Sequence, residues 1–363
     1  MKKVHVVGAG PAGSIAAISA IRSGNEAVIS EEHGAAGVPE NCSGLFSRDG
    51  LESLSQFFDY RKFIINPIHG ADIYFADELF RVRGNGGKPV AFVCGRSAID
   101  QELASRAESE GAKINYNERV NGNGAGAFRS DNIIGADGPL SQVARHFGFP
   151  SLHHFASTLQ ARVRLRCEDP RILQMYISNE RFPGFFGWVI PHDETTADVG
   201  VGVELPHQPV HAWNHLLRLR GIENPPKPRG AIIPLTVREC TAMRIGRKNV
   251  LLTGDAAGQV KSTTGGGVIF GGNCAALAGR HFSSPGRYEM EWRIRHGTDL
   301  ALHSLIHGYL ASRSDSELAA FCRKIKKLNL DEYLSAKGHM DRPVRMITPS
   351  LAVHMLKNLS GWV

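Results

Sequence analysis

The chain has 363 residues, 42% of them hydrophobic, and a formal net charge of +7 at neutral pH. This size allows one large hydrophobic core or two smaller ones. The cysteines form no CxxC pair, which argues against a zinc ribbon, an iron–sulfur site or a disulfide framework and favours reduced cytosolic thiols; they are Cys42, Cys94, Cys167, Cys240, Cys274 and Cys322.

The first 31 residues have the pattern of a strand, a glycine turn, a helix and a second strand that ends in an acid. The apolar run 4–7 predicts the first strand, and a turn with three glycines follows it directly. The first glycine allows a sharp bend, the second lets the backbone approach a pyrophosphate, and the third lets helix and strand pack closely. A helix over 14–23 and a strand over 27–29 then lead to an acid that can accept hydrogen bonds from a ribose. We expect a dinucleotide to contact Gly8, Gly10, Pro11, Ala12, Gly13, Glu31 and Glu32.

The N-terminal residues also permit a different interpretation. Lys2 and Lys3 before an apolar run can imitate a secretory signal, but three glycines and a proline interrupt that run. No other uninterrupted apolar run is long enough to span a bilayer. The sequence therefore predicts a strand at this position and a cytoplasmic protein.

A further candidate lies at the start of a predicted helix. A strand ends at Cys94, and a helix is expected from Arg96 to about Ser109, with Gly111 ending it. From this position the Arg96 guanidinium can bind a phosphate or a ribityl group of a cofactor. A surface ion pair is the alternative role for this side chain.

Two later strands each end in a glycine and an acid. The run 133–134 leads to Asp137, and the run 249–252 leads to Asp255. Ligands of a doubly wound sheet gather at the carboxyl ends of its strands, so these strand ends predict one shared crevice. Asp255 is expected to bind a ribityl hydroxyl, although both acids can alternatively serve only as helix caps. The turn that precedes the next apolar helix is expected to offer N–H groups to an electron-rich ring edge; it consists of Gly265, Gly266 and Gly267.

These elements together resemble the para-hydroxybenzoate-hydroxylase-like FAD superfamily, in which the glycine turn with its acid, the arginine segment and the two Gly/Asp strand ends occur in the same order. The resemblance implies an α/β fold with FAD as the cofactor. It implies a discontinuous Rossmann-like FAD-binding domain and an antiparallel-sheet substrate-binding domain, followed by a helical C-terminal region. The expected ranges are 1–60, 90–150 and 240–285 for the first, 61–89 and 151–239 for the second, and 286–363 for the third. The further FAD contacts expected are Cys42, Ser43, Gly44, Arg96, Val120, Gly138 and Val268.

Two local stretches resemble the geranylgeranyl reductase family, which includes archaeal digeranylgeranylglycerophospholipid reductases. Residues 42–44 match the family's Cys-Ser-Gly, and residues 186–191 with the later glycines 200 and 202 match its aromatic strand. Thr264 and the glycines after it fit the family's glycine cluster. The chain departs from the family pattern where Phe186 replaces tyrosine and Ile190 replaces phenylalanine, and no proline occurs between 258 and 265.

The resemblance implies an FAD-dependent reductase that saturates C=C bonds of geranylgeranyl or other isoprenoid chains in membrane lipids or their precursors. Reduced FAD supplies the hydride in such an enzyme, and an apolar channel excludes water from the alkene. Cys42 and Trp188 are the catalytic candidates, with a plain buried thiol and ordinary core packing as the alternatives. The electron donor stays open among a ferredoxin, NADPH, a deazaflavin and a quinol. The expected substrate contacts are Phe185, Phe186, Trp188 and Pro191.

Two other functions fit parts of the pattern. The stretch Phe-x-Trp-x-Ile-Pro also resembles the Trp-x-Trp-x-Ile-Pro signature of flavin-dependent halogenases, which share this fold with flavin monooxygenases. The Cys-Ser-Gly stretch favours reduction over these oxygen-dependent reactions. A non-catalytic carrier of prenylated partners, similar to GDP-dissociation inhibitors and Rab escort proteins, need not retain Glu31, Arg96 and Asp255.

The C-terminal part combines basic and apolar residues. Basic side chains gather in 323–327, and the stretch 346–363 is apolar with few charges. A solvated helix face is one interpretation, and peripheral contact with an anionic membrane on its cytoplasmic face is preferred to nucleic acid because no nucleic-acid motif is present. The pairs His207/His211 and His303/His307 have helical spacing, but a proline interrupts the first and no acid completes the second, so no metal site is expected.

Overall fold

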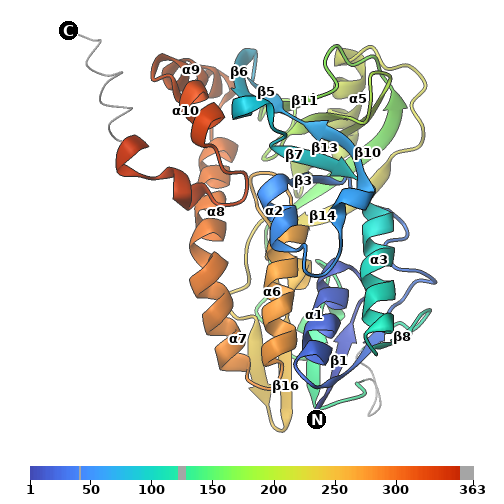
Figure 1. Ribbon diagram of the computed structural model, residues 1–363. Coiled ribbons are helices and arrows are strands. Elements are labelled where there is room, and N and C mark those ends of the chain that lie inside the picture. The colour runs from blue at the N-terminus through green and yellow to red at the C-terminus, as the bar shows by residue number, and fades with distance from the viewer. Residues whose placement is uncertain (41, 122–127, 352–363) are drawn as a thin grey trace.

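The computed structural model describes residues 1–40, 42–121 and 128–351, and its lower half in Figure 1 contains a six-stranded sheet. The strand order is β15-β16-β9-β1-β2-β8. All neighbouring strands are parallel except β15, which pairs antiparallel with β16. The strands are β1 (Lys3–Val7), β2 (Glu26–Ser30), β8 (Lys113–Asn115), β9 (Asn132–Gly135), β15 (Ala242–Ile245) and β16 (Lys248–Leu252).

Helices cover both faces of this sheet, as the alternation of buried side chains along the strands requires. Leu251 of β16 enters the core formed with α1 (Pro11–Arg22), α3 (Arg96–Ser109) and α6 (Val268–His281). Its neighbour Leu252 enters a second core with α4 (Gln142–His146). Figure 1 shows α1 and α6 side by side, and a Cβ added at Gly279 would lie 2.1 Å from the Ala16 carbonyl oxygen. Small residues therefore allow these two helices to approach closely.

The upper half contains a seven-stranded sheet with the order β14-β10-β13-β12-β11-β5-β6, antiparallel except between β11 and β5. One face packs on α5 (Pro209–Leu219), and the other packs on an apolar cluster that includes residues of α9 (Asp315–Lys327). The strands are β5 (Gly70–Phe75), β6 (Glu78–Arg83), β10 (Phe155–Arg164), β11 (Ile172–Ile177), β12 (Gly187–Pro191), β13 (Thr196–Glu204) and β14 (Arg229–Pro234).

A three-stranded sheet lies between the two halves and joins segments from both. Its order is β3-β7-β4, with both pairs antiparallel. The strands are β3 (Leu45–Ser47), β4 (Ile64–Ile68) and β7 (Ala91–Cys94), and α2 (Arg48–Ser53) follows β3 directly. Because β4 belongs to the expected substrate domain and β7 to the expected FAD domain, the division into domains stays a proposal at this boundary.

The C-terminal region is helical over its described part and forms a column along one side of the molecule (Figure 1). A capping box of Ser314 and Glu317 starts α9, and Asp315 accepts hydrogen bonds from Ser178 and Asn179, which directly follow β11. The remaining elements are α7 (Pro285–Trp292), a π-helical turn (Arg293–Gly297), α8 (Thr298–Ala311), α10 (Leu330–Lys337) and a 3₁₀ turn (Pro343–Met346). Most of the apolar stretch 346–363 lies outside the described residues.

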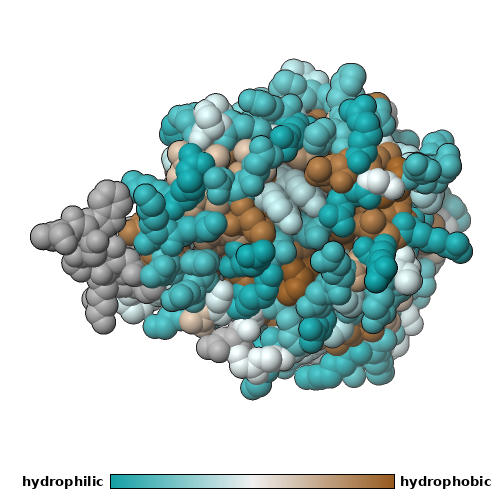
Figure 2. Space-filling view, turned by 90° about the horizontal axis from the view of Figure 1, so that it is seen from above, coloured by the Kyte–Doolittle hydropathy of each residue, from teal (hydrophilic) through white to brown (hydrophobic). Residues whose placement is uncertain are grey.

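The surface and the helix lengths bear on contact with a membrane. Among the described residues, no helix has both the length and the hydropathy needed to cross a bilayer. Seen from above, the molecule is mainly hydrophilic, with hydrophobic side chains visible between polar ones in several places (Figure 2). This face therefore presents scattered apolar side chains rather than one uniform apolar surface.

Candidate active site

The glycine turn between β1 and α1 is built as the sequence predicts. Gly8 has a φ of +100°, and a Cβ there would lie 2.4 Å from the Ala136 carbonyl oxygen. A Cβ at Gly13 would lie 1.9 Å from the Gly8 carbonyl oxygen, so helix and turn are in direct contact. At Gly10 no atom of the described residues lies within 4 Å of a Cβ position. Gly10 and the first turn of α1, which Pro11 begins, therefore face the open side where a pyrophosphate would bind.

Glu31 lies at this turn. Its Oε2 accepts a hydrogen bond from the Ala9 N–H at 2.8 Å, and its Oε1 accepts from the His33 N–H at 3.0 Å. Glu32 instead points to the surface, where it lies 3.4 Å from Arg119 and its side chain is half exposed. Val120 is buried in the core beside β1 and β9. The structure thus brings Glu31 to the turn, places Val120 behind it and leaves Glu32 outside.

The end of β16 meets the same turn from the other side. Gly254 has a φ of +64°, and a Cβ there would lie 3.0 Å from the Ala12 Cβ. Asp255 follows, and its Oδ1 lies 2.7 Å from the position that a Cβ at Gly267 would occupy. The Asp255 carboxylate has no hydrogen-bond donor in the part of the chain that the structure describes, and burial raises its pKa. Asp255 is half-buried, and a carboxylate without a protein donor can accept a hydrogen bond from a ligand hydroxyl. The residue at this position therefore fits the ribityl chain of FAD.

Arg96 begins α3 and forms an ion pair one helical turn further along. Its Nε lies 2.7 Å from Asp100 Oδ1, and both side chains are largely buried. Burial alone would lower the pKa of Arg96, but Asp100 and the Cys42 thiol outweigh it and raise that pKa. Arg96 does form an ion pair, as the alternative interpretation of the sequence proposed, but the pair with Asp100 is buried and not on the surface. The Arg96 charge also acts on Asp255, which links these segments.

Asp137 has a different role from Asp255. Its Oδ1 accepts from the Ser141 hydroxyl at 2.6 Å, and its Oδ2 accepts from the Val143 N–H at 3.0 Å. The carboxylate therefore serves the first turn of α4, which is the capping alternative. Only the backbone of this segment lies at the glycine turn, where Gly138 has a φ of +79° and no atom near its Cβ position within the described residues.

The Cys-Ser-Gly stretch directly precedes β3 of the three-stranded sheet, and Cys42 interacts with Arg96. The Gly44 N–H donates to Cys42 Sγ at 3.4 Å, and a Cβ at Gly44 would lie 2.0 Å from the Cys94 carbonyl oxygen. Gly44 is thus needed for the close approach of this loop to β7. Cys42 and Ser43, which precede it, are partly exposed.

The aromatic residues meet the glycine turn that precedes α6. Phe185 Cζ lies 3.4 Å from the Cβ position of Gly265, and its ring stacks on Phe186 with centroids 4.3 Å apart. Trp188 lies on β12 against Gly200, where a Cβ would be 2.3 Å from the indole. Its Nε1 is buried without a partner among the described residues. The glycines of β13 therefore make room for these rings.

Pro191 does not join this group. It ends β12, and its carbonyl oxygen accepts from Asn66 Nδ2 at 2.9 Å. Since a strand rises about 3.3 Å per residue, Pro191 lies roughly 16 Å along the strand from Phe186. The cavity beside Phe185 and Phe186 is small, with a volume of about 20 Å³. That volume holds one water molecule, so a lipid chain requires the rings to move.

The sequence analysis did not predict a buried ion pair beside the glycine turn that precedes α6. Lys261 is 4% exposed, and its Nζ lies 2.6 Å from Asp341 Oδ1. Asp341 also accepts from the Ser47 hydroxyl, and the Lys261 carbonyl accepts from the Gly265 N–H at 2.7 Å. The pair fixes the turn between residues 261 and 266. The available signal was that Lys261 is the only lysine or arginine from 249 to 279.

Buried histidines near the site make a pH dependence predictable. Burial lowers the pKa of His303 to about 4, and it does the same for His5 and His296. The unfolded chain binds these protons near pH 6.5, so stability is complete above that value and is lost as the pH falls toward 4. We expect the free energy of unfolding to fall by up to about 1.4 kcal/mol per pH unit for each histidine. Urea unfolding at several pH values measures this slope.

His303→Gln should reduce that slope between pH 6.5 and 4 by one histidine's share. His153→Gln, at an exposed position, is the matched control and should leave the slope unchanged. An equal slope in both variants would contradict the assignment of His303 as a neutral buried group. No metal role is assigned to His303 or His307, and the described residues contain no group of three metal-ligating side chains.

The fold and this site define a flavoprotein with a Rossmann-like FAD-binding architecture. The FAD binding domain family model matches residues 1–276. A digeranylgeranylglycerophospholipid reductase of Methanopyrus kandleri is 31% identical over 76% of this chain and 79% of its own length. One from Methanothrix thermoacetophila is 29% identical, covering 89% and 91%. The chain belongs to the geranylgeranyl reductase family of FAD-dependent oxidoreductases.

Solved structures support the fold. A geranylgeranyl bacteriochlorophyll reductase-like protein from Thermoplasma acidophilum superposes with a TM-score of 0.80 at 24% identity, covering 98% of this chain and 99% of that one. The flavin-dependent halogenase CmlS gives a TM-score of 0.65 at 15% identity, covering 99% and 77%. At these identities both similarities concern the fold alone. The predicted fold class, family and cofactor are confirmed.

Proposed function

We propose that this flavoprotein saturates C=C bonds of geranylgeranyl or other isoprenoid chains in membrane lipids or their precursors. The observation that carries the proposal is the contact of the aromatic cluster with the glycine turn, where Phe185 reaches Gly265. FAD, when bound and reduced, supplies the hydride for such a reaction. The proposed reaction needs apolar side chains next to the flavin. The contact between Phe185 and Gly265 supports this arrangement, because Gly265 belongs to the turn expected to bind FAD.

The chain's own residues have three tasks in this reaction. Phe185, Phe186 and Trp188 would orient the alkene and exclude water, since all three are buried in one apolar cluster. An unactivated alkene is a poor hydride acceptor, so early protonation favours reaction, and aromatic faces stabilise the positive charge that develops. Cys42 is the proposed proton-bearing group because it lies beside Arg96 at the same site.

Anaerobic turnover tests the proposed reaction. The FAD-loaded protein, reduced with dithionite and given a geranylgeranyl lipid, should yield products that carry two additional hydrogens per saturated bond, as mass spectrometry shows. Turnover that requires dioxygen would instead indicate a monooxygenase or halogenase. Protein that stays colourless after incubation with FAD would indicate a carrier. The experiment does not depend on the natural electron donor, which we leave open among a ferredoxin, NADPH, a deazaflavin and a quinol.

Replacement of Cys42 separates proton transfer from a role in shaping the wall. Cys42→Ala should slow alkene saturation by roughly 100-fold or more while dithionite still reduces the flavin at the original rate. Cys167→Ala, which removes another partly exposed thiol, is the matched control. A saturation rate within a few-fold of the original protein would leave Cys42 with a packing role.

Peripheral contact with a membrane is also a proposal. The support is that Ile294, Leu305 and Tyr309, on consecutive helical segments, are exposed apolar side chains. They belong to the C-terminal column of helices, which packs on the apolar cluster through Leu310 and residues of α9. Sedimentation with anionic vesicles, compared between the original chain and a Leu305→Ser variant, measures this contact. Equal sedimentation of both proteins would remove the support that Leu305 gives.

A further inference from the structure

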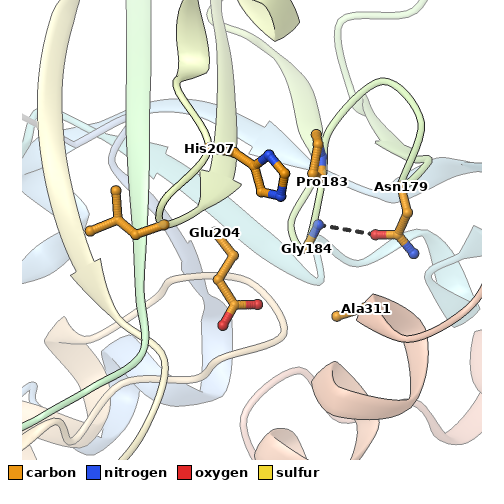
Figure 3. Close-up of a pocket in the computed structure, with 7 residues that line it drawn as sticks. Asn179, Pro183, Gly184, Glu204, His207 and Ala311 are labelled. Carbon is orange, nitrogen blue, oxygen red and sulfur yellow. Dashed lines mark hydrogen bonds between the residues drawn. The ribbon is translucent and has the colours of Figure 1, made fainter.

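A surface recess lies next to the small apolar cavity lined by Phe185 and Phe186. It has a volume of about 210 Å³, and Figure 3 shows Glu204 and His207 facing Gly184, Asn179 and Ala311 across it. Asn179, Gly184 and Ala311 also line the apolar cavity that contains Phe185 and Phe186. The recess and the cavity therefore adjoin at these three residues. A molecule that occupied both would have one end in the recess and its body against the rings.

Hydrogen bonds fix the residues that the recess and the apolar cavity share. The Gly184 N–H donates to Asn179 Oδ1 at 3.0 Å, and the Gly184 carbonyl accepts from His307 Nε2 at 2.8 Å. Asn179 Nδ2 in turn donates to the Leu310 carbonyl at 2.8 Å. These bonds tie the loop before β12 to the end of α8. The recess is thus a fixed feature of the fold.

Glu204 gives the recess its polar character. A Cβ at Gly184 would lie 2.6 Å from Glu204 Cβ and 2.8 Å from Glu204 Oε2, so only glycine leaves room for this side chain. Its other oxygen lies 2.8 Å from His154 Nδ1. His207 contributes an imidazole to the lining. The recess therefore offers a carboxylate acceptor and an imidazole, which hydrogen-bond a hydroxyl group well.

The charge of the lining residues argues against a phosphate ligand. No lysine or arginine stands among the residues that line the recess, all of which the structure describes. Phosphate is bound in proteins chiefly by arginine, lysine or helix N-termini, and a nearby carboxylate repels it. The volume holds several water molecules, so a small polar group fits.

The geometry points to this recess as the binding site for an uncharged, hydroxyl-bearing end of the isoprenoid substrate, such as a prenyl alcohol or a glyceryl ether. The inference rests on the proposed function, because it places the rest of the substrate against Phe185 and Phe186. It adds that this chain prefers a hydroxyl to a phosphate at that end. Glu204 is the residue that sets the preference.

Binding measurements with three probes test this preference. The probes are geranylgeraniol, geranylgeranyl diphosphate and a hydrocarbon of equal length without a polar end, each titrated into FAD-loaded protein and followed by the flavin absorbance. The alcohol should bind at least tenfold more tightly than the diphosphate. Glu204→Ala should weaken the alcohol about tenfold, because a hydrogen bond to a charged group is lost, and should leave the hydrocarbon unchanged.

Reversal of the charge makes the test sharper. Glu204→Lys should reverse the preference in favour of the diphosphate, whereas Glu223→Lys, at an exposed carboxylate, should change neither affinity. Ala311→Trp should fill the recess from α8 and weaken the alcohol without affecting the Glu204–His154 pair. The melting temperatures of all variants show whether each one folds.

The outcomes separate this inference from the proposed function. Tighter binding of the diphosphate by the original protein, or alcohol affinity that is unchanged in both Glu204→Ala and Ala311→Trp, overturns the recess as the hydroxyl site. If alcohol binding depends on Glu204 but the bound alcohol is never saturated under anaerobic reduction, the recess stands and the proposed reaction fails. If saturation occurs with equal KM in all variants, the reaction stands and the recess fails.

Discussion

Replacing Gly13 with alanine is expected to give a protein that is purified without FAD and unfolds at a lower temperature. A Cβ at this position would lie 1.9 Å from the Gly8 carbonyl oxygen and 3.0 Å from the Gly8 carbonyl carbon. Backbone atoms cannot move aside as a flexible side chain does, so α1 must shift away from β1. Overpacking of this kind costs roughly 1–3 kcal/mol. The shift also moves the N–H groups of the first helical turn away from the pyrophosphate position.

The ratio of flavin to protein absorbance and the melting temperature measure the two effects. Gly286→Ala is the matched control, because no described atom lies within 4 Å of its Cβ position and it stands in the first turn of α7. That variant should retain both FAD and stability. Full FAD content in Gly13→Ala would show that the close approach of helix and turn is not needed for the cofactor.

Replacing Asp255 with alanine should weaken FAD binding while leaving the FAD-free protein at least as stable as the original. The half-buried carboxylate has no hydrogen-bond donor among the described residues, and partial burial raises its pKa. Its removal therefore relieves a cost in the free protein. The bound cofactor loses a charge-assisted hydrogen bond of about 1.5–3 kcal/mol, which is roughly a ten- to hundredfold rise in Kd.

Fluorescence titration of FAD gives the Kd, and thermal unfolding of the FAD-free protein gives its stability. Asp131→Ala removes a surface carboxylate that lies 3.7 Å from Lys248 and should change neither quantity. An unchanged Kd in Asp255→Ala would contradict the placement of this residue at the ribityl chain. A loss of stability in the FAD-free variant would show instead that Asp255 has a structural partner.

The glycine turn between β1 and α1 could be predicted from the sequence because its constraints are local. Gly8 and Gly13 are required by distances within a single turn, and their spacing is visible in a dozen residues. The convergence of Glu31 and Asp255 followed from one rule on parallel strands, which places their carboxyl ends at one edge. The start of α3 at Arg96 was likewise given by the adjacent strand and glycine.

Long-range packing decided what could not be predicted. Arg96 is paired with Asp100 inside the protein, and no pattern shows that this helical pair is buried rather than exposed. The glycines of β13 could be counted, but that they accommodate Phe185 and Trp188 depends on strand register. Whether the rings leave an open channel depends on side-chain packing against helices more than 100 positions away in the chain. Lys261 and Asp341, 80 positions apart, meet only in the folded protein.

The contacts of Asp341 with Ser47 and Lys261 join segments that are synthesised at very different times. Ser47 and Asp341 are separated by 294 positions, so the loop that faces the cofactor gains its last support only after nearly all of the described chain has left the ribosome. Early during synthesis the glycine turn between β1 and α1 is present before the glycine turn that precedes α6 has been made. The glycine turn before α6 therefore has its full support only once the segment around Asp341 has folded against it.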